Sequence, residues 1–258
     1  LMRPAALHRI LQYGFFFFFV YVGVRFYFHV QCAMGRMEEY VAKPNSVEAF
    51  LPISALMGLR RLLQAGEFDP VHSAGLTILL MALATAFFCR KAFCGYLCPI
   101  GCASMQLERF GKKLGIHRQL PKWLSIVLSL PKYALLIFFA DLLLWGMDLQ
   151  ALEAFLRTPY NMVADSKMLL FFLNADATLL VILGVLLVGS LLFSGFWCRG
   201  FCPYGALLGL LSMLSPFAVR RVKENCIDCG RCTRACPSRI RVHEKNRISG
   251  PECVGCLE

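Results

Sequence analysis

Residues 93–101 read FCGYLCPIG, and residues 197–205, 104 positions further on, read WCRGFCPYG. In both stretches an aromatic residue precedes a C-x3-C-P-x-G pattern, and each copy follows a long apolar run. Two copies in equivalent places predict two helical hairpins related by a pseudo-twofold axis within the membrane. The repeat therefore indicates both the fold and the place where the chemistry occurs.

Four apolar runs account for most of the chain's hydrophobic character: residues 10–31, 72–89, 123–147 and 177–197. About 20 apolar residues in a helix cross the hydrocarbon core of a bilayer. The 58% share of apolar residues exceeds the roughly 45–50% of a typical soluble domain. This composition argues against a soluble enzyme, a disordered chain or a small disulfide-stapled scaffold. We predict an all-α integral membrane protein with a four-transmembrane-helix bundle, in which Pro131 and Lys132 interrupt the third span.

The charge distribution predicts the orientation of these spans. Nineteen Lys and Arg residues fall in the tails and in the connection after the second span, against six in the two opposite connections. Because the positive side stays cytoplasmic, we expect a protein of the bacterial cytoplasmic (inner) membrane with both termini in the cytoplasm. The net charge of +11 is then explained by topology and by anionic membrane lipids, and nucleic acid is not expected as a partner.

The cysteines of the repeat are candidates for one shared metal centre. Cysteines four residues apart lie about one turn apart on one helical face, which suits two thiolates on one centre. Four such thiolates from two repeats can enclose one 4Fe-4S cluster. A redox-active dithiol, a copper(I) site and simple buried cysteines remain as alternatives. The four candidate ligands are Cys94, Cys98, Cys198 and Cys202.

A second cysteine pattern begins at Cys226 and is more specific. C-x2-C-x2-C-x3-C-P is the bacterial ferredoxin run, in which three cysteines ligate one 4Fe-4S cluster and the fourth ligates its neighbour. A zinc site is the alternative and uses two C-x2-C arms with a longer spacer. A further C-x2-C pair opens a second run just before the sequence stops at Glu258, so we expect the chain to be part of a longer polypeptide. The candidate ligands are Cys226, Cys229, Cys232, Cys236, Cys253 and Cys256.

These patterns divide the chain into two domains. Residues 1–219 are predicted to form the transmembrane domain, and residues 220–258 the start of a small ferredoxin-like iron-sulfur domain. The complete ferredoxin module is expected to hold two 4Fe-4S clusters, with one more at the C-x3-C-P motifs.

Ionisable residues in or near the spans are candidates for a quinone site, since such residues are costly in a membrane and are functional by default. Arg25, His29 and His72 are candidates for a pocket that binds a quinone carbonyl and takes its proton, or that holds a haem. Ordinary interfacial histidines are the alternative. Lys132 and Asp141 are nine residues apart and project to opposing faces, so Lys132 is expected to snorkel to the interface.

Two smaller features lie outside these motifs. Residues 46–66 predict a helix with Pro52 in its first turn and Gly66 as its cap, either interfacial or packed against the protein. Cys102 is expected to be a buried packing residue rather than an extra ligand, and Cys32 and Cys89 have no assigned role.

With the two C-x3-C-P motifs, the four spans and the run from Cys226, the chain resembles the membrane-bound polyferredoxins. This family includes the NapH-type subunit of periplasmic nitrate reduction, the NosR-type protein of nitrous oxide respiration and the CcoG-type accessory protein of the cbb3 oxidase. The resemblance covers nearly the whole chain and implies a four-helix membrane domain with a cytoplasmic ferredoxin module. The chain lacks a flavin-binding N-terminal domain of the NosR type, and its ferredoxin module stops early.

The resemblance implies a membrane iron-sulfur subunit that passes electrons between the quinone pool and a partner oxidoreductase. The chemistry agrees, because quinol releases two electrons and two protons whereas a cluster accepts one electron at a time. Expected partners are quinone and other redox subunits, such as an iron-sulfur protein or a c-type cytochrome. The alternative is an accessory reductase of a metal such as copper, or an assembly factor for a respiratory enzyme.

Overall fold

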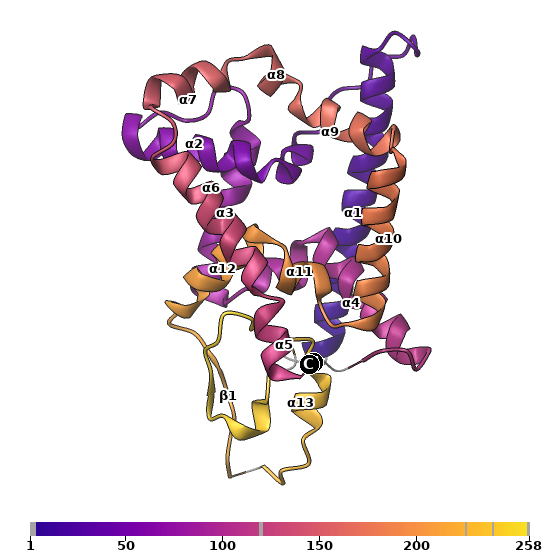
Figure 1. The fold of residues 1–258 in the computed structure, drawn as a ribbon, viewed down its shortest axis with the longest axis vertical. Helices are drawn as coiled ribbons and strands as arrows, with labels where there is room; N and C mark the ends of the chain where they lie inside the picture. Colours follow the sequence, from indigo (N-terminus) through magenta and orange to yellow (C-terminus); the bar gives the residue numbers. More distant parts are fainter. Residues whose placement is uncertain (1–3, 119–120, 225, 239, 257–258) are drawn as a thin grey trace. The chain divides into compact units, whose positions relative to one another are not determined.

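The computed structural model describes residues 4–118, 121–224, 226–238 and 240–256, with only the backbone of Lys122. Arg3, Arg239 and Glu258, which enter the predicted charge count and the predicted end of the ferredoxin module, lie outside the described residues. Helices dominate the described chain (Figure 1). The elements are α1 (Pro4–Ala33), η1 (Asn45–Phe50), α2 (Pro52–Ala65), α3 (Ser73–Cys89), η2 (Phe93–Leu97), α4 (Pro99–Lys113), α5 (Lys122–Val127), α6 (Leu130–Leu144), α7 (Leu149–Leu156), α8 (Pro159–Met162), α9 (Ala164–Leu173), α10 (Ala177–Leu192), α11 (Phe196–Gly200), α12 (Pro203–Met213), β1 (Val219–Arg220), α13 (Arg231–Ala235), η3 (Val242–Glu244) and β2 (Arg247–Ile248).

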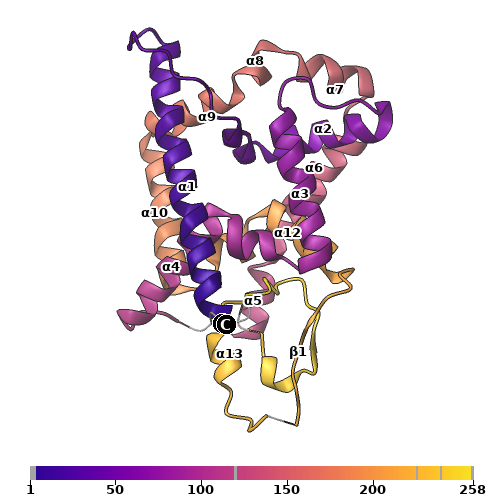
Figure 2. The same ribbon diagram turned by 180° about the vertical axis from the view of Figure 1, so that it is seen from behind.

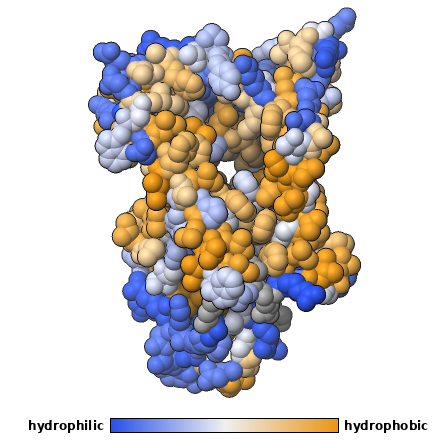
Figure 3. Space-filling view, viewed as in Figure 1, coloured by the Kyte–Doolittle hydropathy of each residue, from blue (hydrophilic) through white to orange (hydrophobic). Residues whose placement is uncertain are grey.

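The apolar helices agree in part with the predicted spans. Two helical stretches are long and apolar enough to cross a membrane, Ala5–Ala33 and Trp123–Leu144. A third is obtained if α9 and α10, which are bent by 86° at a short break, form one span. Two or three membrane-spanning helices are therefore supported among the described residues. Hydrophobic side chains cover α10, whereas the segment with β1 and α13 is mostly hydrophilic (Figure 3).

The other predicted spans correspond to shorter helices. The run at residues 72–89 forms α3 with 17 residues, and the run at 177–197 forms α10 with 16. At 1.5 Å per residue such helices are about 25 Å long, somewhat less than the hydrocarbon core of about 30 Å. The four-helix bundle and its pseudo-twofold axis therefore remain predictions.

The chain forms two compact units, each built from discontinuous segments. Unit 1 contains residues 1–16, 82–136 and 181–258, and unit 2 contains residues 17–81 and 137–180. All four boundaries between the units fall inside helices, namely α1, α3, α6 and α10.

Unit 2 is organised around α2, which begins and ends where the sequence predicts. Pro52 occupies the first turn, and Gly66 has a left-handed φ of 71° with its N–H bonded to Leu62 O. Helices α2 and α7 pack side by side, as both views show (Figures 1 and 2). The pair and α6 share an apolar cluster of buried residues: Met57, Leu143, Leu152 and Leu156.

The arginines of α2 favour the packing interpretation over an interfacial helix. Arg60 is 9% exposed and donates hydrogen bonds to the carbonyl oxygens of Leu143 and Met147. Arg61 is 4% exposed and pairs with Glu67 and Glu153. Both guanidinium groups face protein: Arg60 supplies donors to two main-chain carbonyl oxygens, and the buried Arg61 is paired with carboxylates that themselves remain exposed.

Unit 1 joins the two cysteine patterns. Ala82 and Ala86 of α3 and Leu208 of α12 form a buried core, against which Phe93 and Tyr204 of the two motifs pack. The ferredoxin-like segment contributes a two-stranded antiparallel sheet in which Val219 pairs with Ile248. The small side chains of α3 permit the close approach that places both motifs beside one core.

Candidate iron-sulfur sites

Both C-x3-C-P motifs have the same backbone design. The first cysteine lies on a short helical turn, η2 or α11, and the second stands at the N-terminal cap of the next helix. Cys98 and Cys202 have extended ψ angles of 120° and 104°. A residue that precedes proline is pushed out of the helical region, whereas proline itself fits the first helical turn. The prediction that each pair shares one helical face is therefore wrong, because the proline ends the turn between the two cysteines.

The motif glycines bring the helix N-termini close to the cysteines. The Gly205 N–H donates to Cys202 Sγ over 3.3 Å, and the Gly101 and Ile100 amides bond to Cys98 in the same way. A Cβ at Gly101 would lie 2.2 Å from Cys94 O, and one at Gly205 would lie 3.3 Å from Cys198 O. The glycine that ends the motif must be small because the carbonyl group of the first cysteine lies against it. The amides at these helix starts stabilise negative charge on sulfur.

The four motif cysteines, Cys94, Cys98, Cys198 and Cys202, lie within electrostatic range of one another. Burial, together with the charge of neighbouring thiolates, raises the pKa of Cys94 to about 12 and also raises the pKa values of Cys98 and Cys198. Four clustered thiolates are thus unstable without a cation between them. Such a donor set fits a soft metal centre, which stabilises cysteine in the thiolate form.

Lys91 supplies the positive charge closest to this group. Burial opposes its charge, but Glu252 and the thiolates of Cys94, Cys198 and Cys202 raise its pKa. Arg90 and Arg199, which are close in sequence to the two motifs, make specific bonds of their own. Arg90 donates to Ser212 O and Gly250 O, both at 2.6 Å, and Arg199 donates to Ser125 Oγ at 3.1 Å.

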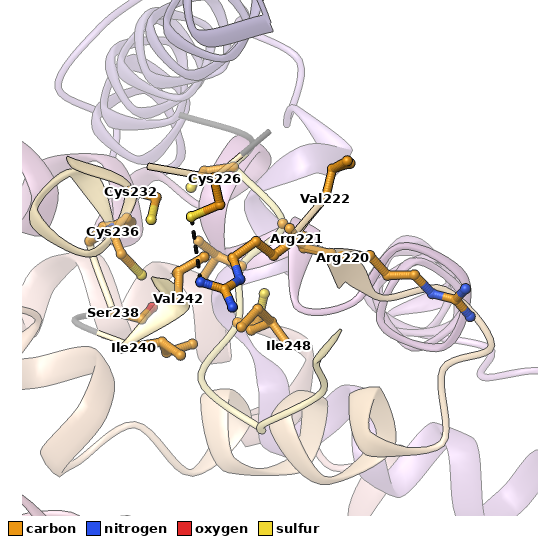
Figure 4. A pocket seen from close by; sticks show the side chains of 16 residues that line it. Arg220, Arg221, Val222, Cys226, Cys232, Cys236, Ser238, Ile240, Val242 and Ile248 are labelled. Carbon is orange, nitrogen blue, oxygen red and sulfur yellow. Dashed lines mark hydrogen bonds between the residues drawn. The ribbon is translucent and has the colours of Figure 1, made fainter. Parts of the chain in front are cut away.

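The second site is a cavity of about 430 Å³ in the ferredoxin-like segment (Figure 4). Arg221 Nη1 lies 3.4 Å from Cys226 Sγ at its edge. Apolar side chains such as Ile240 and Ile248 form part of the wall, and no carboxylate contributes to the described lining. Cys229, the remaining predicted ligand in this segment, is exposed outside the lining. The cysteines that line the cavity are Cys226, Cys232, Cys236, Cys253 and Cys256.

Cysteine side chains around a cavity with a partly apolar wall are surroundings in which an iron-sulfur cluster can be held. Across the described ranges 4–118, 121–224, 226–238 and 240–256, no three His, Cys, Asp or Glu side chains form a group that could hold a metal ion.

The two cysteine sites meet through the C-terminal arm, which we define as residues 250–256. Tyr96 Oη donates to Gly255 O at 3.0 Å and to Cys256 O at 3.3 Å, and the Lys91 amide donates to Cys253 O at 3.2 Å. Gly95 lies against Val254, so closely that a Cβ there would be 3.1 Å from the valine side chain. The arm that carries Cys253 and Cys256 therefore packs directly on the first motif.

A carboxylate that the sequence analysis missed joins this junction. Glu252 pairs with Lys132 and, at 3.6 Å, with Lys91. Lys132 is fully buried, so the prediction that it snorkels to the interface is wrong. The carboxylate compensates the buried ammonium and removes the need for it to reach water. Asp141 is exposed on α6.

The predicted quinone residues have three different surroundings within unit 2. Arg25 is exposed on α1, and His29 Nδ1 bonds to Val41 O at 2.7 Å. His72 is fully buried, with Nε2 2.8 Å from Asn161 O and Nδ1 3.3 Å from Glu48 Oε1. The two histidines are thus engaged in separate sets of contacts, whereas Arg25 is exposed.

A chain of alternating charges extends from His72. Glu48 pairs with Lys43 at 3.3 Å, and Lys43 pairs with Asp165 at 2.6 Å. Burial opposes the ionisation of Glu48, but hydrogen bonds from His72 and the Gly75 amide and the charge of Lys43 hold its pKa below the usual value. The order of charges runs from the buried imidazole to a lysine that is 29% exposed.

The remaining cysteines show no shared pattern. Cys102 is 2% exposed and agrees with its predicted packing role, and burial raises its pKa. Cys32 is partly buried and Cys89 exposed.

Comparison with known proteins agrees with these sites. Residues 71–117 and 175–222 match the family described as a 4Fe-4S binding domain, and residues 218–258 match a 4Fe-4S dicluster domain. The first family therefore covers each C-x3-C-P motif together with its preceding helix, and the second covers the ferredoxin-like segment. No solved structure matches the chain.

Three curated relatives place the chain among redox proteins. YccM of Escherichia coli (strain K12), whose name proposes electron transport, is 41% identical over 92% of this chain and 67% of its own length. Protein NirI of Paracoccus denitrificans is 33% identical over 69% of this chain but only 25% of its own length. The ferredoxin-type protein NapH of Haemophilus influenzae is 27% identical over 70% of this chain and 63% of its own length.

The chain belongs to the membrane polyferredoxin family of 4Fe-4S proteins. It is accordingly a membrane-associated electron-transfer protein that binds iron-sulfur clusters. The close packing at the motif glycines and the contact of the C-terminal arm with the first motif agree with this membership.

Proposed function

We propose that this protein passes electrons between the quinone pool and a partner oxidoreductase through a series of iron-sulfur centres. The observation that carries the proposal is the seating of the C-terminal arm on the first C-x3-C-P motif. A protein that passes single electrons through several centres needs those centres close together. Here the carbonyl oxygens of the C-terminal arm accept hydrogen bonds from Tyr96 and from the Lys91 amide beside the first motif. The whole protein's substrates and partners belong to this proposal, since the chain spans two thirds or less of the relatives described.

The motif cysteines jointly ligate one 4Fe-4S cluster in this proposal. Their burial, their mutual electrostatic interaction and the matching amide bonds at Cys98 and Cys202 support a single shared centre. The ferredoxin-like segment supplies Cys226, Cys229 and Cys232 to one further cluster and Cys236, Cys253 and Cys256 to another. When bound, the clusters accept and release single electrons, while the chain's own part is to hold the thiolates and balance their charge.

The membrane arrangement in this proposal has four spans with both termini in the cytoplasm. The four apolar runs at residues 10–31, 72–89, 123–147 and 177–197 support four crossings. The excess of Lys and Arg in the tails and after α3 supports the orientation in an inner membrane. The equivalent backbone design of the two motifs supports the pseudo-twofold repeat.

Quinol oxidation also needs a proton acceptor, and we assign it to His72. An imidazole against a carboxylate is a standard means of taking up a proton. The chain of charges through Glu48 and Lys43 to Asp165 leads from this buried group to a partly exposed lysine. His29 and Arg25 would then serve only to shape the surrounding surface.

Spectroscopy of the full-length protein tests the shared cluster. Cys98→Ser and Cys202→Ser should each remove the same EPR signal, while the signals from the run at Cys226 persist. Different losses in the two variants, or no loss of iron, would contradict a shared centre. Zinc in place of iron would contradict the electron-transfer function itself.

Reduction assays test the assignment of His72. His72→Gln should abolish reduction of the clusters by a quinol analogue but leave their reduction by dithionite intact. His29→Gln is the matched control and should retain quinol-dependent reduction. If His29→Gln loses it and His72→Gln does not, the assignment is reversed.

A further inference from the structure

Glu252 lies at the junction of three segments that are far apart in the sequence. Its carboxylate contacts Lys132 Nζ of α6, and its other oxygen lies 3.6 Å from Lys91 Nζ, just after α3. Its backbone carbonyl accepts a 2.6 Å hydrogen bond from Ser238 Oγ of the ferredoxin-like segment. One residue thus connects the helix end before the first motif, a helix of the membrane domain and the segment that lines the cysteine cavity.

The charges at this junction are well withdrawn from water. The side chains of Lys91 and Lys132 are 4% and 1% exposed, and that of Glu252 is 21% exposed. Burial opposes the ionisation of Glu252, but the charges of Lys91 and Lys132 lower its pKa. A buried ion pair contributes little net stability compared with apolar residues, yet removal of one partner strands a charge and is costly. Such a pair fixes geometry more than it adds stability.

The neighbours of Glu252 show which geometry is fixed. Cys253 follows it directly, and the next residue, Val254, packs against Gly95 between the first motif's cysteines. A cavity of about 60 Å³ is lined by Glu252 and Lys91 together with Cys94 and Cys198. Glu252 therefore holds the C-terminal arm where the arm faces cysteines of both repeats.

We propose that Glu252 is a positioning residue that locks the C-terminal arm onto the C-x3-C-P centre. In this way Glu252 sets the distance over which an electron passes between that centre and the cluster ligated by the arm. This inference rests on the proposed function, because it assumes a centre on each side of the junction. The hydrogen bonds of Tyr96 and of the Lys91 amide all end on backbone carbonyls of the arm. These bonds and the one from Arg90 to Gly250 O orient the arm, whereas Glu252 is the one charged side chain that the arm itself contributes within the described residues 250–256.

The test uses the full-length protein with Glu252→Gln, which keeps the shape and removes the charge. Glu244→Gln is the matched control, since Glu244 lies in the same segment but is half-exposed and paired with Arg241 on the surface. Three quantities are measured: iron content, the magnetic interaction between the reduced centres by EPR, and the rate at which an electron from the C-x3-C-P centre reaches the ferredoxin clusters. Lys132→Met gives a second variant that loosens the same anchor from the other side.

Glu252→Gln and Lys132→Met should keep the wild-type iron content and dithionite reduction. Both should weaken the EPR interaction and slow the transfer by about tenfold or more. Glu252→Gln leaves two buried ammonium groups without their carboxylate, and Lys132→Met removes the closer of the two partners that hold Glu252. Glu252→Asp should recover part of the rate, and Glu244→Gln should behave as wild type. Unchanged coupling and rate in both anchor variants would overturn the inference while leaving the proposed function standing. Absence of clusters from the wild-type protein would instead refute the proposed function.

Discussion

Gly101 is the position at which the first C-x3-C-P motif tolerates least additional volume. A methyl group there would lie 2.2 Å from the carbonyl oxygen of Cys94, a backbone atom that cannot rotate away. To reach an ordinary contact distance, the start of α4 and the first motif's turn would have to separate by about 1 Å. That movement would also draw Cys98, which caps α4, away from its amide donors.

We expect Gly101→Ala to destabilise the protein by roughly 1–3 kcal/mol, as overpacked sites do. For a chain of this size the loss corresponds to a melting temperature lower by about 2–10 °C. The variant should also bind less iron at the motif centre. Thermal unfolding in detergent followed by circular dichroism, with iron analysis of the same sample, measures both effects.

The repeat supplies a matched control for this substitution. At Gly205 the new methyl group would lie 3.3 Å from Cys198 O and 3.5 Å from Cys202 Sγ, a tight but tolerable contact. Gly184 of α10 has nothing within 4 Å, so Gly184→Ala should be neutral or stabilising through helix propensity. The reasoning fails if Gly101→Ala melts no earlier than Gly205→Ala.

Three further predictions concern unit 2 and the topology. The pKa of Glu48 is lowered in the fold, so its ionised form stabilises the protein above about pH 4.5. This contribution is lost as the pH falls through the lowered pKa. Glu48→Gln should therefore unfold more easily than wild type near pH 7, and the difference should disappear in acid. Arg60→Met should lower stability by roughly 1–3 kcal/mol in denaturant unfolding, because two carbonyl groups near the end of α6 lose their donor. A reporter fused after Glu258 should remain cytoplasmic and one inserted at Asn45 should be exported, and detection of both on one side would refute the span assignment.

Local sequence signals were sufficient for many individual elements. Pro52 and Gly66 mark the bounds of α2 because a proline fits a helix start and a glycine accepts the left-handed cap. The ferredoxin run at Cys226 and the repeat at Cys94 and Cys198 carry their chemistry in short spacings. Matches of both patterns to 4Fe-4S families confirm the predicted class of cofactor.

Other predictions depended on how helices break and pack. The one-face arrangement of each cysteine pair was wrong because the proline after the second cysteine stops the helical turn. The lengths of α3 and α10 were set by where their ends bend, which hydropathy does not record. Whether the helix in residues 46–66 is interfacial or packed was decided by its arginines, since Arg60 and Arg61 are buried donors to carbonyl and carboxylate oxygens.

The sequence by itself determined the ligands, because cysteine spacing, proline and glycine act over a few residues. Only the tertiary structure decided the partners of the charges. Lys132 and Glu252 are 120 residues apart, and nothing in the composition around either indicates the other. Their pairing follows from burial: once α6 and the C-terminal arm pack together, a lysine ammonium without water must find a carboxylate, and long-range packing alone selects which one.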